Sequence, residues 1–324
     1  MSPALATAAD AHVLHTPVLS ERIVALLSPA LTSTAAVLVD CTLGMGGHAA
    51  ALLEANPQAE LIGIDRDRYA LEIAGAHLVR FGERVRLVQA GFAELNAVLA
   101  ELRIPQVAAI LADLGLSSLQ IDDTARGFAY ATTSDLDMRM DTRQTLTAAQ
   151  IVNTWSEDEL ARIFTVYGEE RFARRIAKAV VAARPLTDSA ALAAVIRAAL
   201  PAAIRYGADT GHPAKRVAQA LRIAVNDELG QLTNLLPSAL ARLQVGGRLA
   251  VLSYHSLEDR LVKNAFAAAS ADTAPAGLPL VPEQYQARFI TLTKGAERPD
   301  ATESELNPRA KSARLRAVQR IKEA

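Results

Sequence analysis

The sequence predicts an α/β protein, in which a doubly wound parallel sheet carries a small inserted helical domain. Four short apolar runs between residues 37 and 113 alternate with helical segments through short connections, which is the pattern of consecutive βαβ units. Each run ends in polar or glycine residues, so these residues should gather at one edge of the sheet. The next buried run begins only at Arg248, whereas a βαβ unit needs about 30 residues, which indicates an insertion.

The first half of the sheet can be followed along the chain. Residues 1–14 are rich in Ala, Ser and Thr without periodicity, and we expect them to form a flexible tail. A helix from Ser20 to Leu27, with Ser20 as its N-cap, should pack beside the first strand. Asp67 should cap the helix that follows the second strand. The four strands are expected at residues 37–40, 61–65, 85–90 and 107–112.

The insertion is predicted to be helical. From Thr145 to Leu200 apolar residues recur at helical spacing. We interpret the helix that begins at Ala214 as the resumed crossover, which leads to a fifth strand at residues 248–253. The N-caps expected within the insertion are Thr147, Ser156 with Glu159 in capping-box spacing, and Thr187 or Asp188.

Two further strands, at residues 289–293 and 313–318, would close the sheet as an antiparallel hairpin. The main domain is therefore expected to be discontinuous, with residues 15–125 and 212–324. Residues 126–211 would form the inserted helical domain, which should recognise the substrate.

Composition limits the class of protein. With 324 residues, 51% of them hydrophobic, the chain can bury a core and form one large or two ordinary domains. The formal net charge of -1 gives no general attraction to polyanions, so a basic surface has to come from local clusters. A single cysteine, Cys41, excludes an internal disulfide and a thiolate zinc site, and no histidine pair has metal-ligand spacing, so no metal is expected. Because the chain has neither a signal peptide nor a run of about 18 apolar residues, we expect it to be cytoplasmic.

The stretch from Val37 to Ala49 reads as a strand, a glycine-rich turn and the start of a helix, which is where α/β proteins bind nucleotide-like ligands. Gly44, Gly46 and Ala49 match the G-x-G-x-x-G/A dinucleotide pattern. Asp40 argues against a pyrophosphate, because two like charges about 4 Å apart repel by about 1 kcal/mol in water and more strongly at lower dielectric. S-adenosylmethionine carries an ammonium and a sulfonium but no phosphate, so Asp40 favours it over NAD. The alternative is that Asp40 only caps the turn.

Two residues after the next strands are candidates for the nucleoside part of such a ligand. Asp65 ends the second strand 18 residues beyond Gly47, a spacing that suits an acid accepting hydrogen bonds from ribose hydroxyls. Because NAD also contains this ribose, Asp65 does not discriminate between the two cofactors. Phe92 follows the third strand, where a purine could lie against its ring, and a role in the core is the equally weighted alternative.

Polar residues also follow the fourth and fifth strands. Asp113 ends the fourth, and His255 follows the fifth at the same predicted edge. His255 is a candidate to accept or relay a proton, and an ordinary structural histidine is the alternative. A hydrolase triad built on His255 and Ser256 is rejected, because no G-x-S-x-G elbow precedes them and adjacent residues do not easily face each other.

Basic residues gather in two segments. Four of them share one face of a predicted helix at positions i, i+3, i+4 and i+7: Arg171, Arg174, Arg175 and Lys178. The alternative for this face is a solvated surface balanced by Glu169 and Glu170. The C-terminal segment from Asn307 onward has six basic residues, including Arg309, Lys311 and Arg314, against the single acid Glu323. Two basic segments in a nearly neutral protein indicate a polyanionic substrate with salt-sensitive binding.

Many separate motifs, in one order, resemble those of the RsmH (MraW) family, and they span nearly everything from His15 onward. Members of this family are S-adenosylmethionine-dependent enzymes that methylate N4 of a cytidine in the decoding region of 16S rRNA. The matching stretches are residues 15–19, 40–48, 63–67, 113–120, 126–128, 136–140, 168–170, 212–214, 253–263 and 307–309.

The resemblance implies a Rossmann-like, class I methyltransferase sheet and a set of cofactor contacts. These contacts would be Gly46, Gly47, His48, Asp65, Phe92, Asp113 and Gln120. Asp113 and His255 are the candidates for handling the proton of the cytosine amine. Three positions depart from the family pattern: Asp135 stands for the usual Pro, Arg68 for Pro and Tyr254 for Phe. The first of these could alter the loop that leads into the helical domain.

We therefore expect methylation of the N4 amine of a cytidine in 16S rRNA, with either the free rRNA or the small ribosomal subunit as the substrate. Two alternatives are an NAD-dependent Rossmann oxidoreductase and a non-catalytic RNA-binding assembly factor. No membrane partner is expected, and the sequence leaves open whether the protein forms a homodimer.

Overall fold

The structure is a computed structural model, and it separates into two compact units. The first unit comprises residues 1–115 and 230–324, and the second comprises residues 116–229. The residues that the structure describes are 17–117, 120, 123, 126–128, 133–201, 213–275, 281–307 and 310–323. The predicted tail, residues 1–14, lies outside them.

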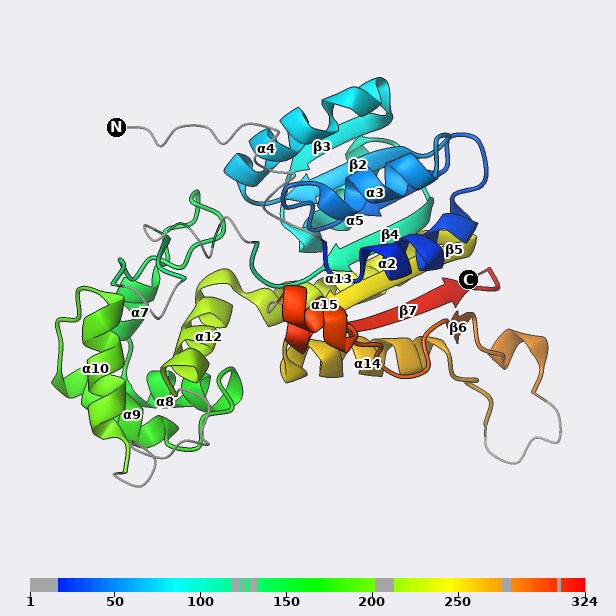
Figure 1. Ribbon diagram of the computed structural model, residues 1–324. Helices are drawn as coiled ribbons and strands as arrows, with labels where there is room; N and C mark the ends of the chain where they lie inside the picture. Colours follow the sequence, from blue (N-terminus) through cyan, green and yellow to red (C-terminus); the bar gives the residue numbers. More distant parts are fainter. Residues whose placement is uncertain are drawn as a thin grey trace. The chain divides into compact units, whose positions relative to one another are not determined.

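The first unit contains a seven-stranded sheet with the order β3-β2-β1-β4-β5-β7-β6 (Figure 1). Strands β1 to β5 are parallel to their neighbours, β7 runs antiparallel to β5, and β6 runs antiparallel to β7. This arrangement confirms the doubly wound α/β sheet with an antiparallel closing hairpin. The strands are β1 (Val37–Asp40), β2 (Glu60–Asp65), β3 (Val85–Gln89), β4 (Val107–Asp113), β5 (Leu243–Ser253), β6 (Phe289–Thr291) and β7 (Arg314–Arg320).

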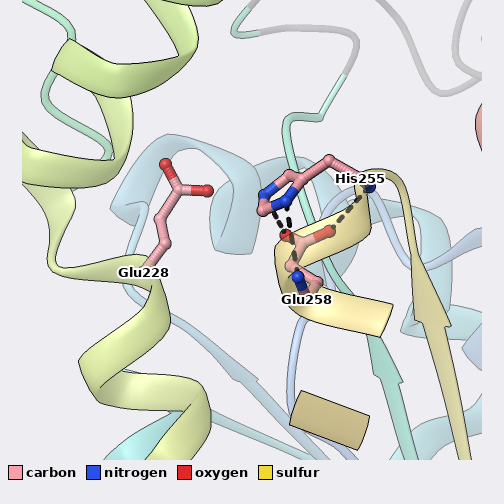
Figure 2. A group of neighbouring side chains, drawn as sticks. All are labelled: Glu228, His255 and Glu258. Atoms are coloured by element: carbon pink, nitrogen blue, oxygen red, sulfur yellow. Dashed lines mark hydrogen bonds and ion pairs between the residues drawn. The ribbon is translucent and has the colours of Figure 1, made fainter. Parts of the chain in front are cut away.

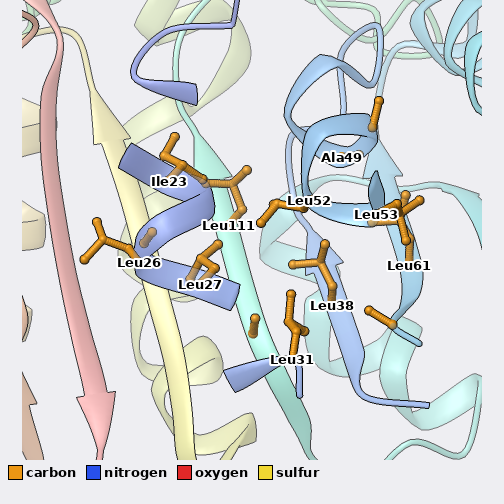
Figure 3. Packing of buried hydrophobic residues seen from close by; sticks show 14 of the residues in the cluster. Ile23, Leu26, Leu27, Leu31, Leu38, Ala49, Leu52, Leu53, Leu61 and Leu111 are labelled. Carbon is orange, nitrogen blue, oxygen red and sulfur yellow. The ribbon is translucent and has the colours of Figure 1, made fainter. Parts of the chain in front are cut away.

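Helices cover both faces of this sheet, which explains why the central strand β4 is buried over six consecutive residues. On one face α2, α3 and α4 bury their apolar sides in one core cluster, part of which Figure 3 shows around Leu27, Leu38 and Leu52. On the other face α5, α13 and α14 bury theirs in a second cluster. The bounds are α2 (Ser20–Leu27), α3 (Gly47–Ala55), α4 (Arg68–Leu78), α5 (Leu95–Glu101), α13 (Glu228–Arg242), α14 (Ser256–Ala269) and α15 (Ala301–Leu306).

The sequence of helix α2 predicted its buried face correctly but its N-cap wrongly. Ile23, Leu26 and Leu27 lie at i, i+3 and i+4 and are all buried, as the periodicity predicts. Ser20 is not the N-cap, however. Leu19 holds that position with a φ of 52° and no side-chain cap, and its N–H donates to the Glu303 carboxylate at 2.6 Å.

The second unit is a bundle of helices around its own apolar core. Its N-caps at Thr147, Ser156 and Asp188 accept hydrogen bonds from the backbone of the following turn, as predicted. The helices are α7 (Ala148–Thr154), α8 (Glu157–Val166), α9 (Ala173–Ala182), α10 (Ser189–Ala199) and α12 (Pro213–Asn226).

The interpretation of the helix from Ala214 as the sheet crossover is wrong. This helix is α12, and its residues Val217 and Leu221 are fully buried in the core of the helical unit, together with α7, α8 and α10. The crossover to β5 is made instead by α13, whose Leu232 and Leu235 are buried against the sheet. The helical unit, residues 116–229, is consequently larger than the predicted 126–211.

The remaining described segments are short. Among the described residues, no helix combines the length and apolar character needed to cross a membrane. The 3-10 helices are η1 (Ser28–Ala30), η2 (Val79–Arg84), η3 (Phe92–Glu94), η5 (Glu283–Tyr285) and η6 (Ala310–Ser312).

Candidate functional site

Three aspartates end neighbouring strands at one edge of the sheet. Asp40, Asp65 and Asp113 are the last residues of β1, β2 and β4. Because β2, β1 and β4 are adjacent and parallel, their carboxyl ends lie at the same edge, where ligands bind in open α/β sheets. The fold thus brings together acids that are far apart in the sequence.

The loop from β1 to α3 is shaped by glycine. Gly44 and Gly46 have φ values of 53° and 79°, in the left-handed region that costs other residues free energy. Gly47 begins α3, and a Cβ placed on it would lie 2.7 Å from Cγ of Pro17. The glycines therefore allow the tight turn into α3, and Gly47 leaves room for Pro17 at the N-terminus of this helix.

The Asp65 side chain links this loop to the loop that follows β2 by hydrogen bonds to both. One carboxylate oxygen accepts a hydrogen bond from the Gly44 N–H at 2.8 Å, and the other accepts one from the Asp67 N–H at 2.9 Å. Burial raises the pKa of Asp65, and these two amide hydrogen bonds work against that shift. Asp67 in turn caps α4 by accepting from the Tyr69 N–H, as predicted.

Asp40 is almost completely buried at the end of β1. Its carboxylate accepts a hydrogen bond from the Thr42 N–H at 3.1 Å, which is the turn-capping role weighed for it in the sequence. Burial raises the pKa of Asp40 to about 7, while His48 and the Thr42 amide favour the ionised form. A carboxyl group poised near neutral pH is sensitive to any new charge placed beside it.

Asp113 lies between two side chains of the first unit. The Tyr254 hydroxyl donates to Oδ1 of Asp113 at 2.8 Å, and Nε2 of His48 lies 3.4 Å from Oδ2. The Asp113 N–H donates to the Thr42 hydroxyl at 2.6 Å. His48 is buried at the start of α3, and among the described residues neither of its ring nitrogens has a hydrogen-bond partner. The structure therefore joins the predicted residues His48 and Asp113, and adds Tyr254 and Thr42, which no spacing in the sequence indicated.

Phe92 begins η3 and is half-buried beside the guanidinium of Arg66, which lies 5.3 Å from the centre of its ring. The same guanidinium donates to the Gln231 side chain at 2.6 Å, and only 8% of Arg66 is exposed. Arg66 was missed in the sequence because one of its side-chain partners, Gln231 on α13, lies 165 positions away along the chain. The cation packed against the ring fixes the orientation of Phe92.

His255 has a structural contact that accounts for its position. It is the N-cap of α14, where Nδ1 accepts from the Glu258 N–H at 3.4 Å, and its own N–H donates to the Glu258 carboxylate (Figure 2). Glu228, also drawn in Figure 2, accepts two hydrogen bonds at 2.7 Å from Arg222 within the helical unit. These side chains thus have partners within their own units, and we assign no metal to them. A proton-transfer role for His255 stays a prediction.

Gln120 lies in the helical unit and is buried, with 5% of its surface exposed. Its side-chain oxygen accepts from the Ser117 N–H at 3.1 Å, and the Ser117 hydroxyl accepts from the Gln120 N–H at 3.3 Å. This reciprocal pair defines the local conformation after β4. The cofactor contact implied by the resemblance stays a prediction.

The predicted basic face of the helical unit is present on and just before α9. Arg171, Arg174, Arg175 and Lys178 are all exposed, while Ile176 and Val180 on the opposite side are fully buried. Of the two acids weighed against this face, Glu170 is buried and lies 3.5 Å from Arg216, whereas Glu169 is exposed, so four exposed cations stand against one exposed acid. A positive, solvent-facing strip is the result.

The C-terminal basic residues are less available than the sequence suggested. Arg314 and Arg316 on β7 both pair with Asp259, and Arg320 donates to the backbone oxygens of Ala241 and Leu243. The predicted RNA contact at Arg314 is therefore weakened, since its charge is shared with Asp259. Lys311 is exposed, and Arg309 lies outside the described residues.

Comparison with known proteins identifies close relatives over nearly the whole chain. The model of the MraW methylase family matches residues 12–321. The ribosomal RNA small subunit methyltransferase H of Acidothermus cellulolyticus is 54% identical over 314 residues, which is 96% of this chain and 95% of that protein. The protein of the same name from Streptomyces avermitilis is 53% identical, over 95% of this chain and 98% of its own length.

Proposed function

The chain belongs to the MraW methylase family, and on this premise we propose that it transfers a methyl group from S-adenosylmethionine to the N4 amine of a cytidine in the decoding region of 16S rRNA. The observation that carries the proposal is the identity of more than half of the residues with proteins called ribosomal RNA small subunit methyltransferase H, across almost their full lengths. The site at the sheet edge adds physical support.

The residues at this edge fit the proposed cofactor. Two buried acids with raised pKa values, Asp40 and Asp65, suit a ligand that brings cations and hydroxyl donors, and they disfavour a pyrophosphate. Among the described residues the ring nitrogens of His48 have no hydrogen-bond partner, and Nε2 lies 3.4 Å from Asp113, so the imidazole keeps hydrogen-bonding capacity for a ligand at this edge. An NAD-dependent oxidoreductase is therefore the weaker candidate.

S-adenosylmethionine supplies an electrophilic methyl group on a sulfonium, so the protein has to bind, orient and desolvate the reacting groups. Positioning alone can contribute about 7 to 11 kcal/mol to lowering a reaction barrier. The amine of cytosine is delocalised into its ring, so a nearby acceptor should help its proton leave. Asp113 is our candidate, since its side chain is partly exposed at the edge of the sheet. The cytosine must leave its stack to reach this edge.

The direct test of the proposed function is nucleoside mass spectrometry of small-subunit rRNA, from cells with and without the gene. Loss of N4-methylcytidine in the deletion strain, and its return on complementation, is the expected result. An unchanged N4-methylcytidine content would rule the assignment out.

The raised pKa of Asp40 predicts that protons are released when S-adenosylmethionine binds. In the folded protein its pKa of about 7 lies above the usual value of 3.8 for an aspartate, so as pH rises from about 4 to about 7 this group lowers the free energy of unfolding. A cation bound nearby would lower the pKa again. Binding of S-adenosylmethionine at pH 7 should therefore release roughly half a proton, measured by calorimetry in buffers of different ionisation enthalpy.

The matched control for this measurement is Asp40→Asn, which keeps the shape of the side chain and removes its charge. We expect it to abolish most of the proton release. Equal release by the two proteins would show that Asp40 is not the titrating group.

The basic strip on α9 gives a prediction about salt. Neutralising three of its charges should weaken binding of small-subunit rRNA by at least about tenfold at low salt, and should reduce the slope of log affinity against log salt by about 2. Filter binding at several salt concentrations measures both. The variant combines Arg174→Gln, Arg175→Gln and Lys178→Gln.

The control changes the same number of exposed basic residues on other helices of the same unit. It should keep the wild-type salt slope to within about one unit. If the two triple variants lose affinity equally, the effect is one of total charge and α9 is not the binding face. The control substitutions are Arg162→Gln on α8, Arg197→Gln on α10 and Lys215→Gln on α12.

A further inference from the structure

Tyr254 follows the last residue of β5 and donates its hydroxyl proton to Oδ1 of Asp113 at 2.8 Å. Burial and the neighbouring Asp113 carboxylate raise the pKa of Tyr254 well above its usual value of 10. The phenol therefore keeps its proton over the physiological range. It acts as a permanent donor toward the carboxylate.

The ring that carries this hydroxyl is held from two directions. Gly115 has a φ of 100°, and a Cβ added to it would lie 3.2 Å from Cδ2 of Tyr254, so the ring packs directly against the glycine. The Tyr254 N–H donates to the Glu258 carboxylate at 2.8 Å, which fixes the backbone at the base of the side chain. The donor is thus held in place before any ligand arrives.

The hydrogen bond leaves the second oxygen of Asp113 free to face a different group. Oδ2 lies 3.4 Å from Nε2 of His48, while Oδ1 is taken by Tyr254. Rotation of the carboxylate would break the contact with Tyr254, so the hydroxyl selects one orientation. A phenylalanine at this position would have no donor to offer to the carboxylate.

We propose that Tyr254 is a positioning residue, whose hydroxyl orients the Asp113 carboxylate and so strengthens binding of the methyl-donor cofactor through Asp113. The inference rests on the proposed function, because it takes Asp113 as a cofactor contact. It goes beyond that function by assigning the Tyr254 hydroxyl a role in holding the Asp113 carboxylate.

The test is Tyr254→Phe, which removes one oxygen atom and keeps the ring that packs against Gly115, so the protein should fold. Calorimetric titration should give a Kd for S-adenosylmethionine that is raised about fivefold. This is less than the full value of a hydrogen bond to a charged group, because water can reach Asp113 in the variant. KM for S-adenosylmethionine should rise in the same ratio, while KM for small-subunit rRNA stays unchanged. A purely structural role would not separate the two KM values in this way.

The matched control is Tyr285→Phe, which removes a phenol oxygen from η5 of the same unit and should leave Kd unchanged. A second comparison uses Asp113→Asn, in which the acceptor has lost its charge. In that background Tyr254→Phe should change Kd by less than about twofold, because the hydroxyl acts through the Asp113 charge. An equal change in both backgrounds would overturn the proposal. If Asp113→Asn binds too weakly to titrate, the single variant decides alone.

The outcomes separate the two proposals. A wild-type protein that binds no S-adenosylmethionine contradicts the proposed function. A wild-type protein that binds it, with a Tyr254→Phe variant of the same Kd, contradicts the positioning role alone.

Discussion

Asp65→Ala is expected to reduce affinity for S-adenosylmethionine by at least about 100-fold and to abolish methyl transfer, while binding of small-subunit rRNA is largely retained. Asp65 accepts hydrogen bonds from the Gly44 and Asp67 amides, so its removal frees the two loops at the sheet edge. Hydrogen bonds to charged groups contribute about 1.5 to 3 kcal/mol each, and any direct contact with the cofactor is lost in addition. The basic strip on α9 lies in the other unit and keeps its residues. Calorimetry for the cofactor and filter binding for the RNA measure the two effects separately.

A suitable control is Asp272→Ala, since Asp272 is an exposed aspartate that also accepts a backbone hydrogen bond, from the Ala287 N–H at 2.8 Å. It should keep both affinities near wild type. An Asp65→Ala protein that binds the cofactor within threefold of wild type would contradict the assigned site. The same variant tests the non-catalytic alternative, because an RNA-binding assembly factor would keep its activity without Asp65.

The sheet was predictable because its signals are local. Runs of buried residues, each ending in an acid or a glycine, indicate parallel strands and the edge at which they end. The N-caps at Asp67, Ser156 and Asp188 were predictable for the same reason, because a cap satisfies amides only two or three positions away. Ser20 failed because Glu303, which is remote in the sequence, satisfies the Leu19 amide.

The boundary of the helical unit was not predictable from such signals. Helix α12 is amphipathic, and the pattern Val217, Leu221 and Val225 fits packing against a sheet as well as packing against other helices. Periodicity specifies that a face is buried but not what buries it. The choice between α12 and α13 as the crossover therefore depended on tertiary contacts.

The candidate site residues also divide into those indicated by local sequence signals and those that depend on tertiary contacts. Gly44, Gly46, Asp65 and Phe92 were proposed from their distance along the chain to a strand end, and the family resemblance added Gly47, His48 and Gln120. Arg66, Thr42 and Tyr254 act on other residues of the site through contacts that span up to 165 positions. The sequence also does not show which charges are paired, since the ion pair of Arg314 with Asp259 joins residues that are far apart along the chain.

The helical unit has its own point of sensitivity at Gly127. Its φ is 75°, and an added Cβ would lie 2.1 Å from the backbone oxygen of Asp135. The same two backbone segments are joined by a hydrogen bond, in which the Met138 N–H donates to the Arg126 backbone oxygen at 3.0 Å. Neighbouring Phe128 is buried in the core of the unit. The two backbone segments must therefore approach closely for the core to close.

Gly127→Ala is consequently expected to lower the free energy of unfolding of the helical unit by about 3 kcal/mol or more, since backbone has to move and a left-handed conformation is imposed on alanine. Urea denaturation followed by circular dichroism, and RNA binding under native conditions, should both show the loss. The first unit, which does not contain Gly127, should keep its stability.

Gly295→Ala separates the cost of the steric clash from the cost of the left-handed backbone. Gly295 has a φ of 80°, and no atom of the described residues lies within 4 Å of an added Cβ. It should cost only about 1 to 2 kcal/mol, the penalty for a left-handed alanine without a clash. A Gly127→Ala variant no less stable than Gly295→Ala would show that the segments at Gly127 and Asp135 can separate freely. In that case the departure from the family pattern at Asp135 lies in a loop without structural constraint. A large difference between the variants would instead make the backbone at Asp135, which also bridges to Asp188, a fixed part of the helical unit.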